Sequence, residues 1–204
     1  WPGALEEDTD KALDLYERMV QLQIPQGFYD MAAMMGNSNG LTNPATDGLT
    51  YLDRAAQLGN PEAQVELGKI YIYELNEDEL GLKYYQCAAE QGYASAYYRL
   101  GSYYWNVKNN FPQATRNFQI AASLGHDVAA MRLEAVFDKN TPPDLALWYL
   151  PDDNLKALYH DIYMQLEADP DTRFPNLVKE HPLPPHPTQG YDADKDINWK
   201  PGAD

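Results

Sequence analysis

The sequence contains a single cysteine, Cys87, among its 204 residues. One cysteine cannot form an intrachain disulfide, and it cannot supply the several thiolates of a cysteine-based zinc site. Long apolar runs are missing as well, because pieces such as 145–150 are far shorter than the roughly 18–20 residues that a membrane-spanning helix requires. The sequence therefore excludes a disulfide-stapled scaffold and predicts no direct insertion into a membrane.

Positive charge is scarce, since 15 Lys and Arg residues stand against 31 Asp and Glu residues, a formal net charge of −16. Proteins that bind nucleic acids neutralise phosphates with Lys and Arg, and anionic membrane surfaces attract basic segments. The composition argues against both partners and indicates a partner with a basic or polar surface. Hydrophobic residues make up 44% of the chain, which is ordinary for a globular protein with its own core.

Recognisable catalytic motifs are also absent: the chain has no G-x-S-x-G, no P-loop, no G-x-G-x-x-G and no H-E-x-x-H. None of the four histidines, His126, His160, His181 and His186, stands in a local motif with a nucleophilic Ser or Cys. We therefore predict a protein that is not an enzyme and carries no cofactor. His126 is interpreted as a turn residue that caps a helix or faces solvent, and Cys87 as a small buried filler.

One acidic segment resembles the start of a calcium loop, with Asp192, Asp194 and Asp196 at alternate positions. Ile197 stands where such a loop needs a glycine, and Ala203 where it needs a bidentate glutamate. The segment is interpreted as a solvated acidic tail, and no metal site is predicted.

The first two thirds of the chain repeat with a period near 33 residues. Ala55-Ala56-Gln57-Leu58-Gly59 returns at 88–92 and at 121–125, and Ala63-x3-Leu67-Gly68-x2-Tyr71 returns at 96–104. A fainter copy of the second pattern follows at 129–137, and Met35-Gly36 after Gly27 is taken as an earlier one. A period of this length indicates a stack of supersecondary units, because no single unit can bury its apolar face alone.

Each repeat is predicted to be a pair of helices. The pattern Ala-x3-Leu-Gly-x2-Tyr places its residues on one helical face, and the glycine lets the facing helix approach closely. Gly59, Gly92 and Gly125 stand where a helix ends in the left-handed conformation, and Pro61 stands where the next helix begins. The prediction is an all-α, right-handed α-solenoid.

These motifs resemble the Sel-one-like repeat (SLR) family, which is related to the tetratricopeptide repeat. The resemblance covers residues 27–138, with units near 27–58, 59–91, 92–124 and 125–138. Residues 1–26 are assigned to an N-terminal capping helix, with Ala12, Leu15, Tyr16, Met19 and Val20 facing inward. Residues 139–204 are assigned to a C-terminal helix, from Pro151 to about Ala168, and a proline-rich tail.

The tail contains most of the prolines, since ten of the 15 fall within 142–201. Proline favours extended, polyproline-like backbone, above all at 181–187. We expect this segment to lie along the protein's own surface; the alternative is a ligand for an aromatic groove on another protein.

The first helices of stacked pairs line a concave face, and some of their positions are not needed for packing between repeats. Tyr and Trp at such positions are favoured anchors of interfaces. The predicted partner-binding positions are Glu62, Val65, Lys69, Ile72 and Tyr73, then Ser95, Tyr98, Ser102, Trp105 and Asn106, with Asp30, Ala33, Asn37, Val128, Met131 and Asp138 from the flanking repeats. Tyr73, Tyr98 and Trp105 are expected to have no internal packing role, unless the C-terminal helix or tail covers them.

The resemblance implies a protein-binding module. Small SLR proteins of Gram-negative bacteria include scaffolds and regulators, and immunity proteins that neutralise type VI secretion effectors, notably phospholipases. An immunity protein that meets a toxin in the periplasm and occludes its active site is the favoured hypothesis. The alternatives are an envelope adaptor or regulatory scaffold without a toxin partner, a cytoplasmic location, and a hydrolase using His160 or His181.

Overall fold

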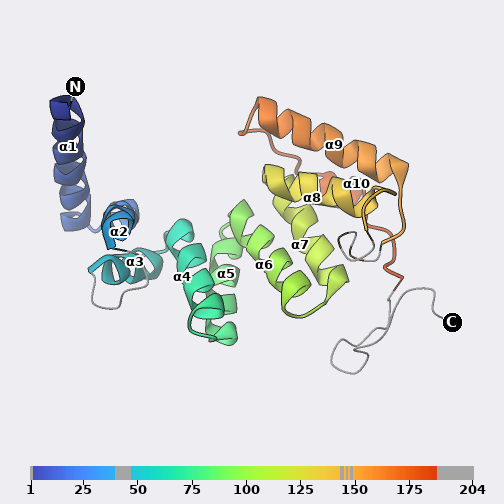
Figure 1. The fold of residues 1–204 in the computed structure, drawn as a ribbon, viewed down its shortest axis with the longest axis horizontal. Helices are drawn as coiled ribbons and strands as arrows, with labels where there is room; N and C mark the ends of the chain where they lie inside the picture. The colour runs from blue at the N-terminus through green and yellow to red at the C-terminus, as the bar shows by residue number, and fades with distance from the viewer. Residues whose placement is uncertain (1, 40–46, 143–144, 146, 148, 188–204) are drawn as a thin grey trace. The chain divides into compact units, whose positions relative to one another are not determined.

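The computed structural model describes residues 2–39, 47–142, 145, 147 and 149–187, and these form ten α-helices and no strand (Figure 1). The predicted all-α class is confirmed. No helix in these ranges is long and apolar enough to cross a membrane. The helices are α1 (Pro2–Gln21), α2 (Pro25–Asn39), α3 (Asp47–Gln57), α4 (Pro61–Tyr73), α5 (Asp78–Glu90), α6 (Ala94–Asn106), α7 (Phe111–Ser123), α8 (Asp127–Phe137), α9 (Asp153–Ala168) and α10 (Leu177–Glu180).

The helices pack as consecutive hairpins within two compact units, residues 1–91 and 92–204. In the first unit α2 pairs with α3 and α4 with α5, while α1 packs against α2. In the second unit α6 pairs with α7 and α8 with α9. The helix hairpin that the repeat predicted is therefore the building block of both units.

Backbone geometry at the helix ends agrees with the predicted turns. Gly59, Gly92 and Gly125 have φ angles of 90°, 78° and 93°, the left-handed region that glycine enters without steric cost. After Gly59, the Asn60 side chain accepts a hydrogen bond from the Ala63 backbone N–H at 2.7 Å, and α4 begins. A cap of this kind typically stabilises a helix by about 1 kcal/mol.

Glycines inside the helices mark close crossings, as predicted. A Cβ atom on Gly68 would lie 2.5 Å from the Tyr85 ring and 2.9 Å from the Gly81 carbonyl oxygen. The equivalent atom on Gly101 would lie 2.6 Å from the Phe118 ring. Only a residue without a side chain leaves room for these fully buried rings, so the two glycines set the spacing within the α4–α5 and α6–α7 pairs.

The first repeat differs from the expected register. Gly27 lies inside α2, where its Cα faces Met19 of α1, and the left-handed turn before α2 falls at Gln23 with φ 57°. Gln23 and Gly59 are 36 residues apart, whereas Gly59 and Gly92 are 33 apart. The extra residues shift the pattern, so that buried Ala32, and not Gly36, takes the place of Gly68.

Helix α1 covers most of the predicted N-terminal segment, but one of its predicted inward residues points away. Leu15 is 54% exposed, whereas Ala12, Tyr16, Met19 and Val20 are partly buried. Only Val20 of this face packs against the core cluster of the first unit.

Beyond α8 the chain returns to cover the second unit. Asp152 caps α9 by accepting hydrogen bonds from the backbone N–H groups of Asn154 and Leu155 at 2.9 and 3.0 Å. After α9 the described tail forms α10, which packs against α7, and then an extended strap, residues 181–187. The strap also contacts α7, because Gln119 donates to the His181 carbonyl oxygen and the ring centroids of Phe111 and His186 lie 5.9 Å apart. The proline-rich segment therefore lies on the protein's own surface, as expected. The tail also contributes to the core, since Leu177 of α10 is 4% exposed and His186 of the strap is 5% exposed.

Candidate partner-binding surface

The predicted positions on α4 divide between surface and core. Tyr73 is 50% exposed, and Glu62 and Lys69 are partly exposed; Lys69 pairs with Glu66 at 3.1 Å. Val65 and Ile72 are only 5% and 4% exposed. Since an interface residue must offer area to the partner, Glu62, Lys69 and Tyr73 are the candidate contact residues of α4 in the first unit, and Val65 is a core residue.

The two aromatic residues on α6 have internal contacts, so the expectation that they lack a packing role is wrong. The Tyr98 ring stacks on the imidazole of His126, with 4.5 Å between ring centroids and 16° between planes. The Trp105 ring lies edge-on to Phe118 at 6.4 Å and receives the guanidinium of Arg132 over its face at 4.4 Å. Both rings remain partly exposed, which leaves part of each for a partner.

Ser102 and Asn106 extend this face along α6. The Ser102 hydroxyl donates a hydrogen bond to the Tyr98 carbonyl oxygen at 3.0 Å, so its proton is engaged within the helix. Asn106, the last residue of α6, is exposed. Met131 on α8 adds a 44% exposed apolar side chain. An exposed methionine is an adaptable contact for a protein partner.

Sequence reasoning missed the role of Arg132. Arg132 stands 33 residues after Arg99 and 66 after Glu66. This position is therefore charged in three successive repeats, and that regularity could have marked Arg132 in the sequence. A cation over a partly desolvated indole contributes roughly 1 kcal/mol. Arg132 thereby fixes the orientation of Trp105 on the candidate surface.

His126 caps a helix, which is one of the two roles that the sequence analysis left open for it. Its Nδ1 accepts a hydrogen bond from the Ala129 backbone N–H at 3.3 Å, at the N-terminus of α8. Burial lowers the pKa of His126 and outweighs the opposite effect of Asp127. The imidazole is therefore neutral at pH 7, which is the state that can accept this bond.

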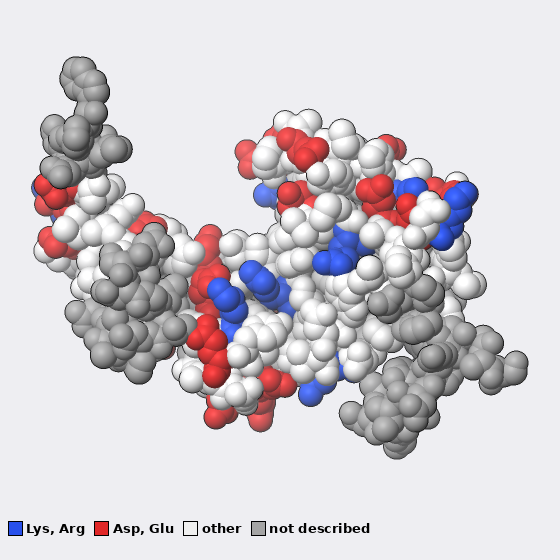
Figure 2. All heavy atoms as spheres, viewed as in Figure 1, with Lys and Arg blue, Asp and Glu red and all other residues white. Residues whose placement is uncertain are grey.

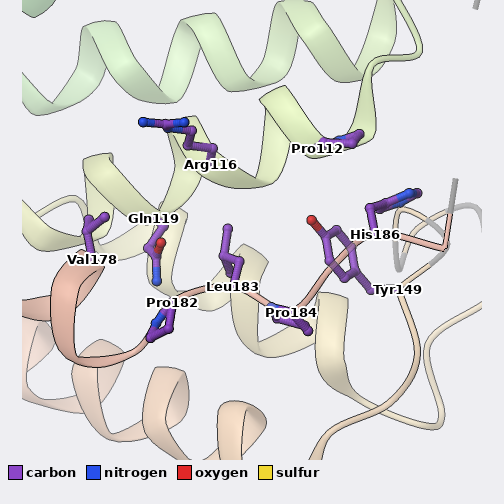
Figure 3. Close-up of a pocket in the computed structure, with 9 residues that line it drawn as sticks. All are labelled: Pro112, Arg116, Gln119, Tyr149, Val178, Pro182, Leu183, Pro184 and His186. Carbon is purple, nitrogen blue, oxygen red and sulfur yellow. The ribbon is translucent and has the colours of Figure 1, made fainter. Parts of the chain in front are cut away.

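The strap and α7 enclose a groove of about 450 Å³ in the second unit (Figure 3). On its floor, Gln119 Nε2 donates hydrogen bonds to the Tyr159 hydroxyl at 2.9 Å and to the His181 carbonyl oxygen at 2.6 Å. His186 Nε2 lies 2.6 Å from the Leu147 carbonyl oxygen, with Tyr149 edge-on to its ring, and burial lowers its pKa. Gln119 and His186 thus fasten the strap.

The remaining candidate groups have ordinary surroundings. His160 lies 3.2 Å from a Glu134 carboxylate oxygen, and its side chain is half exposed. Cys87, expected to be buried, is exposed on the outer face of α5 between buried Tyr85 and Ala88. Asp192, Asp194 and Asp196 lie outside the described residues. Within those residues, no cluster of His, Cys, Asp and Glu could hold a metal ion.

Comparison with known proteins identifies the repeats. Residues 1–23, 61–93 and 94–126 match the family model described as Sel1 repeat. The second and third matches correspond to the α4–α5 and α6–α7 hairpins, and the first includes α1. No curated protein matches the chain.

Solved structures give a closer likeness. The immunity protein Pa5087 from Pseudomonas aeruginosa is 59% identical, with a TM-score of 0.81, over 98% of this chain and 75% of that one. The immunity protein PA5088 from the same organism is 61% identical, with a TM-score of 0.82, over 92% of this chain and 72% of that one.

A Sel1 repeat protein from Oxalobacter formigenes, 19% identical with a TM-score of 0.59 over 75% of this chain and 63% of that one, shares the fold. The repeat matches and the long, highly identical alignments agree with the helix hairpins described above. The chain therefore belongs to the Sel1-repeat family.

Proposed function

We propose that this protein is an immunity protein, which binds a cognate antibacterial effector and blocks its action. The observation that carries the proposal is the 59% and 61% identity to two Pseudomonas aeruginosa immunity proteins over almost the whole chain. The Sel1-repeat fold supports the same conclusion, because stacked helix pairs offer extended surfaces for other proteins.

We assign the effector to the type VI secretion phospholipases and place the encounter in the periplasm. The support is the SLR resemblance, since the small SLR proteins of Gram-negative bacteria include immunity proteins against such effectors. The net charge of −16 favours a basic or polar effector groove and speeds association at low ionic strength. The envelope adaptor is the rival, and it would have no toxin partner.

In the mechanism we propose, the first helices of the hairpins contact the effector and occlude its active site. Two features of these helices, taken within each unit, support the proposal. Tyr73 and Met131 are exposed apolar side chains on α4 and α8, and Trp105 is an indole held in place by Arg132. Aromatic residues held rigidly lose little conformational entropy on binding, which makes them effective anchors.

The test uses two methionines of similar exposure within the second unit. Met131 on α8 is 44% exposed and Met164 on α9 is 47% exposed. Met131→Asp should weaken binding of the cognate phospholipase effector by roughly tenfold or more, because it places a charge in an apolar contact. Met164→Asp should leave binding and unfolding unchanged.

The same variants are then expressed in a sensitive bacterium that receives the effector in its periplasm. Parent and Met164→Asp should protect the cells, and Met131→Asp should not. Absence of binding and protection by the parent would refute the immunity function and favour the adaptor. Loss of binding in Met164→Asp alone would place the interface on the second helices.

A further inference from the structure

A pocket in the first unit, between α3 and α4, has the lining of a site for a long cationic side chain. Its volume is about 330 Å³, and it is lined by Leu49, Thr50, Asp53, Leu67, Ile70, Tyr71 and Leu75. Leu67 and Ile70 are 2% and 6% exposed and form an apolar floor, while Leu75 is 55% exposed at the edge. Asp53 supplies the one carboxylate of this lining.

Asp53 is a charge without a cationic partner in the described part of the chain. It accepts a hydrogen bond from Gln57 Nε2 at 2.6 Å, whereas the neighbouring Arg54 is engaged with Gln23 at 2.7 Å. A carboxylate holds several acceptor positions, and one amide donor leaves most of them available. On the α3 side of the pocket, the Asp53 carboxylate can therefore accept a hydrogen bond from a second donor.

An aromatic wall stands beside the carboxylate. Tyr71, which lines the pocket, stacks on Tyr84 of α5 with 5.5 Å between ring centroids and 10° between planes. The pKa of Tyr84 is raised by burial first and then by the charge of Asp53, so this carboxylate acts on the Tyr84 hydroxyl. Tyrosine faces attract cations, and the attraction grows where water is excluded.

Several acidic residues lie close in the sequence to Leu75, an exposed lining residue of the pocket. Leu75 belongs to the loop between α4 and α5, which also carries Glu74 and Glu77, and Asp78 and Glu79 form the first turn of α5. Backbone hydrogen bonds from Leu75 to Ile70 and from Glu77 to Tyr71, at 3.1 and 2.7 Å, hold this loop against α4. Figure 2 shows carboxylate side chains gathered over the ends of α4 and α5 that the loop joins. Lys83 pairs with Glu79 at 3.1 Å.

We infer that this pocket receives a lysine or arginine side chain of the protein partner, with its methylene stem against Leu67 and Ile70 and its cationic group at Asp53. The occupant follows from charge complementarity and shape: a long apolar stem matches the floor, and a positive end matches the single carboxylate. The inference deepens the proposed function by naming a chemical feature of the effector, and it rests on that function for the effector's identity.

The first experiment needs no effector. The full chain labelled with ¹⁵N is titrated with the blocked tripeptides acetyl-Ala-Arg-Ala-amide and acetyl-Ala-Lys-Ala-amide, with the Leu and Glu tripeptides as controls. A basic tripeptide should shift the amide signals of Thr50, Asp53 and Leu75, and Asp53→Asn should reduce these shifts several-fold. Equal shifts with the Leu tripeptide, or unchanged shifts in Asp53→Asn, would overturn the inference.

The second experiment measures binding of the effector to Asp53→Asn and to Glu90→Gln. Glu90 is an exposed residue of the same unit, so its variant removes the same charge at another place. Asp53→Asn should weaken binding about tenfold and reduce its salt dependence, while Glu90→Gln should stay within about twofold. Equal binding by both variants refutes the pocket and leaves the immunity function standing. Failure of the parent to bind the effector refutes the immunity function. The tripeptide titration then tests by itself whether the pocket binds a cationic side chain.

Discussion

The short helix α10 provides a direct test of whether the tail is part of the core. Leu177 is 4% exposed and belongs to the core cluster of the second unit, whereas its neighbour Val178 is 39% exposed. Replacing a buried leucine by alanine removes its transfer free energy and leaves a cavity, together about 2–5 kcal/mol. Because α10 lies at the edge of this core, where the chain can partly collapse, we expect Leu177→Ala to cost about 2–3 kcal/mol.

The measurement is urea unfolding followed by far-ultraviolet circular dichroism, with thermal unfolding of the same samples. A loss of 2–3 kcal/mol corresponds to a fall in Tm of roughly 5–10 °C for a chain of this size. Val178→Ala is the matched control and should change the free energy of unfolding by less than about 0.5 kcal/mol. Equal unfolding curves for the two variants would show that residues 170–187 cover the surface without stabilising it.

Two further predictions concern the repeats themselves. Gly101→Ala should lower the stability of the full chain by about 1–3 kcal/mol in urea unfolding, since the new Cβ would lie 2.6 Å from the Phe118 ring and 3.0 Å from the Ala114 carbonyl oxygen; a variant as stable as the parent would contradict the close crossing. The pKa of His126 is lowered by burial, so the unfolded chain binds this proton more readily than the folded protein does. The contribution of neutral His126 to the free energy of unfolding is therefore present above the unfolded pKa of about 6.5 and is lost as pH falls below it. His126→Asn keeps an acceptor at the cap and should therefore narrow the difference in stability between pH 7.5 and 5.5, and an unchanged difference would refute this reasoning.

Local features of the fold were predictable from the sequence because they depend on a few neighbouring residues. A left-handed turn favours glycine, a helix start favours asparagine followed by proline, and a close crossing requires the absence of a side chain. Gly59, Asn60 and Gly68 meet these requirements within ten positions of one another. The all-α class and the hairpin of each repeat follow from such signals alone.

The register of the first repeat was not predictable in this way. Its left-handed residue is Gln23, which a sequence pattern does not distinguish from any other glutamine. Two contacts hold it: its side-chain amide donates to the Val20 carbonyl oxygen at 3.1 Å, and Arg54 donates to it at 2.7 Å. Arg54 is 31 residues away, so the conformation depends on tertiary structure that the local pattern does not contain.

The environments of the candidate surface residues also depend on tertiary contacts that the local sequence pattern does not contain. The repeat identified which positions lie outside the packing pattern, but it did not indicate what else would cover them. Tyr98 and Trp105 are covered in part by His126 and Arg132, residues of the following repeat. The core role of the strap was also hidden, because Gln119 and His181 are 62 residues apart.

Equivalent positions of the repeat therefore do not have equivalent environments. Val65, Tyr98 and Met131 are spaced by 33 residues and occupy the same place on the first helices of their pairs. Val65 is 5% exposed, Tyr98 is partly buried against the next repeat, and Met131 is 44% exposed. In the described residues α8 is followed by α9 and the tail, and not by another repeat. Met131 is the most exposed of the three side chains, so Met131→Asp tests the interface more directly than a substitution at Tyr98, whose loss would disturb binding and packing together.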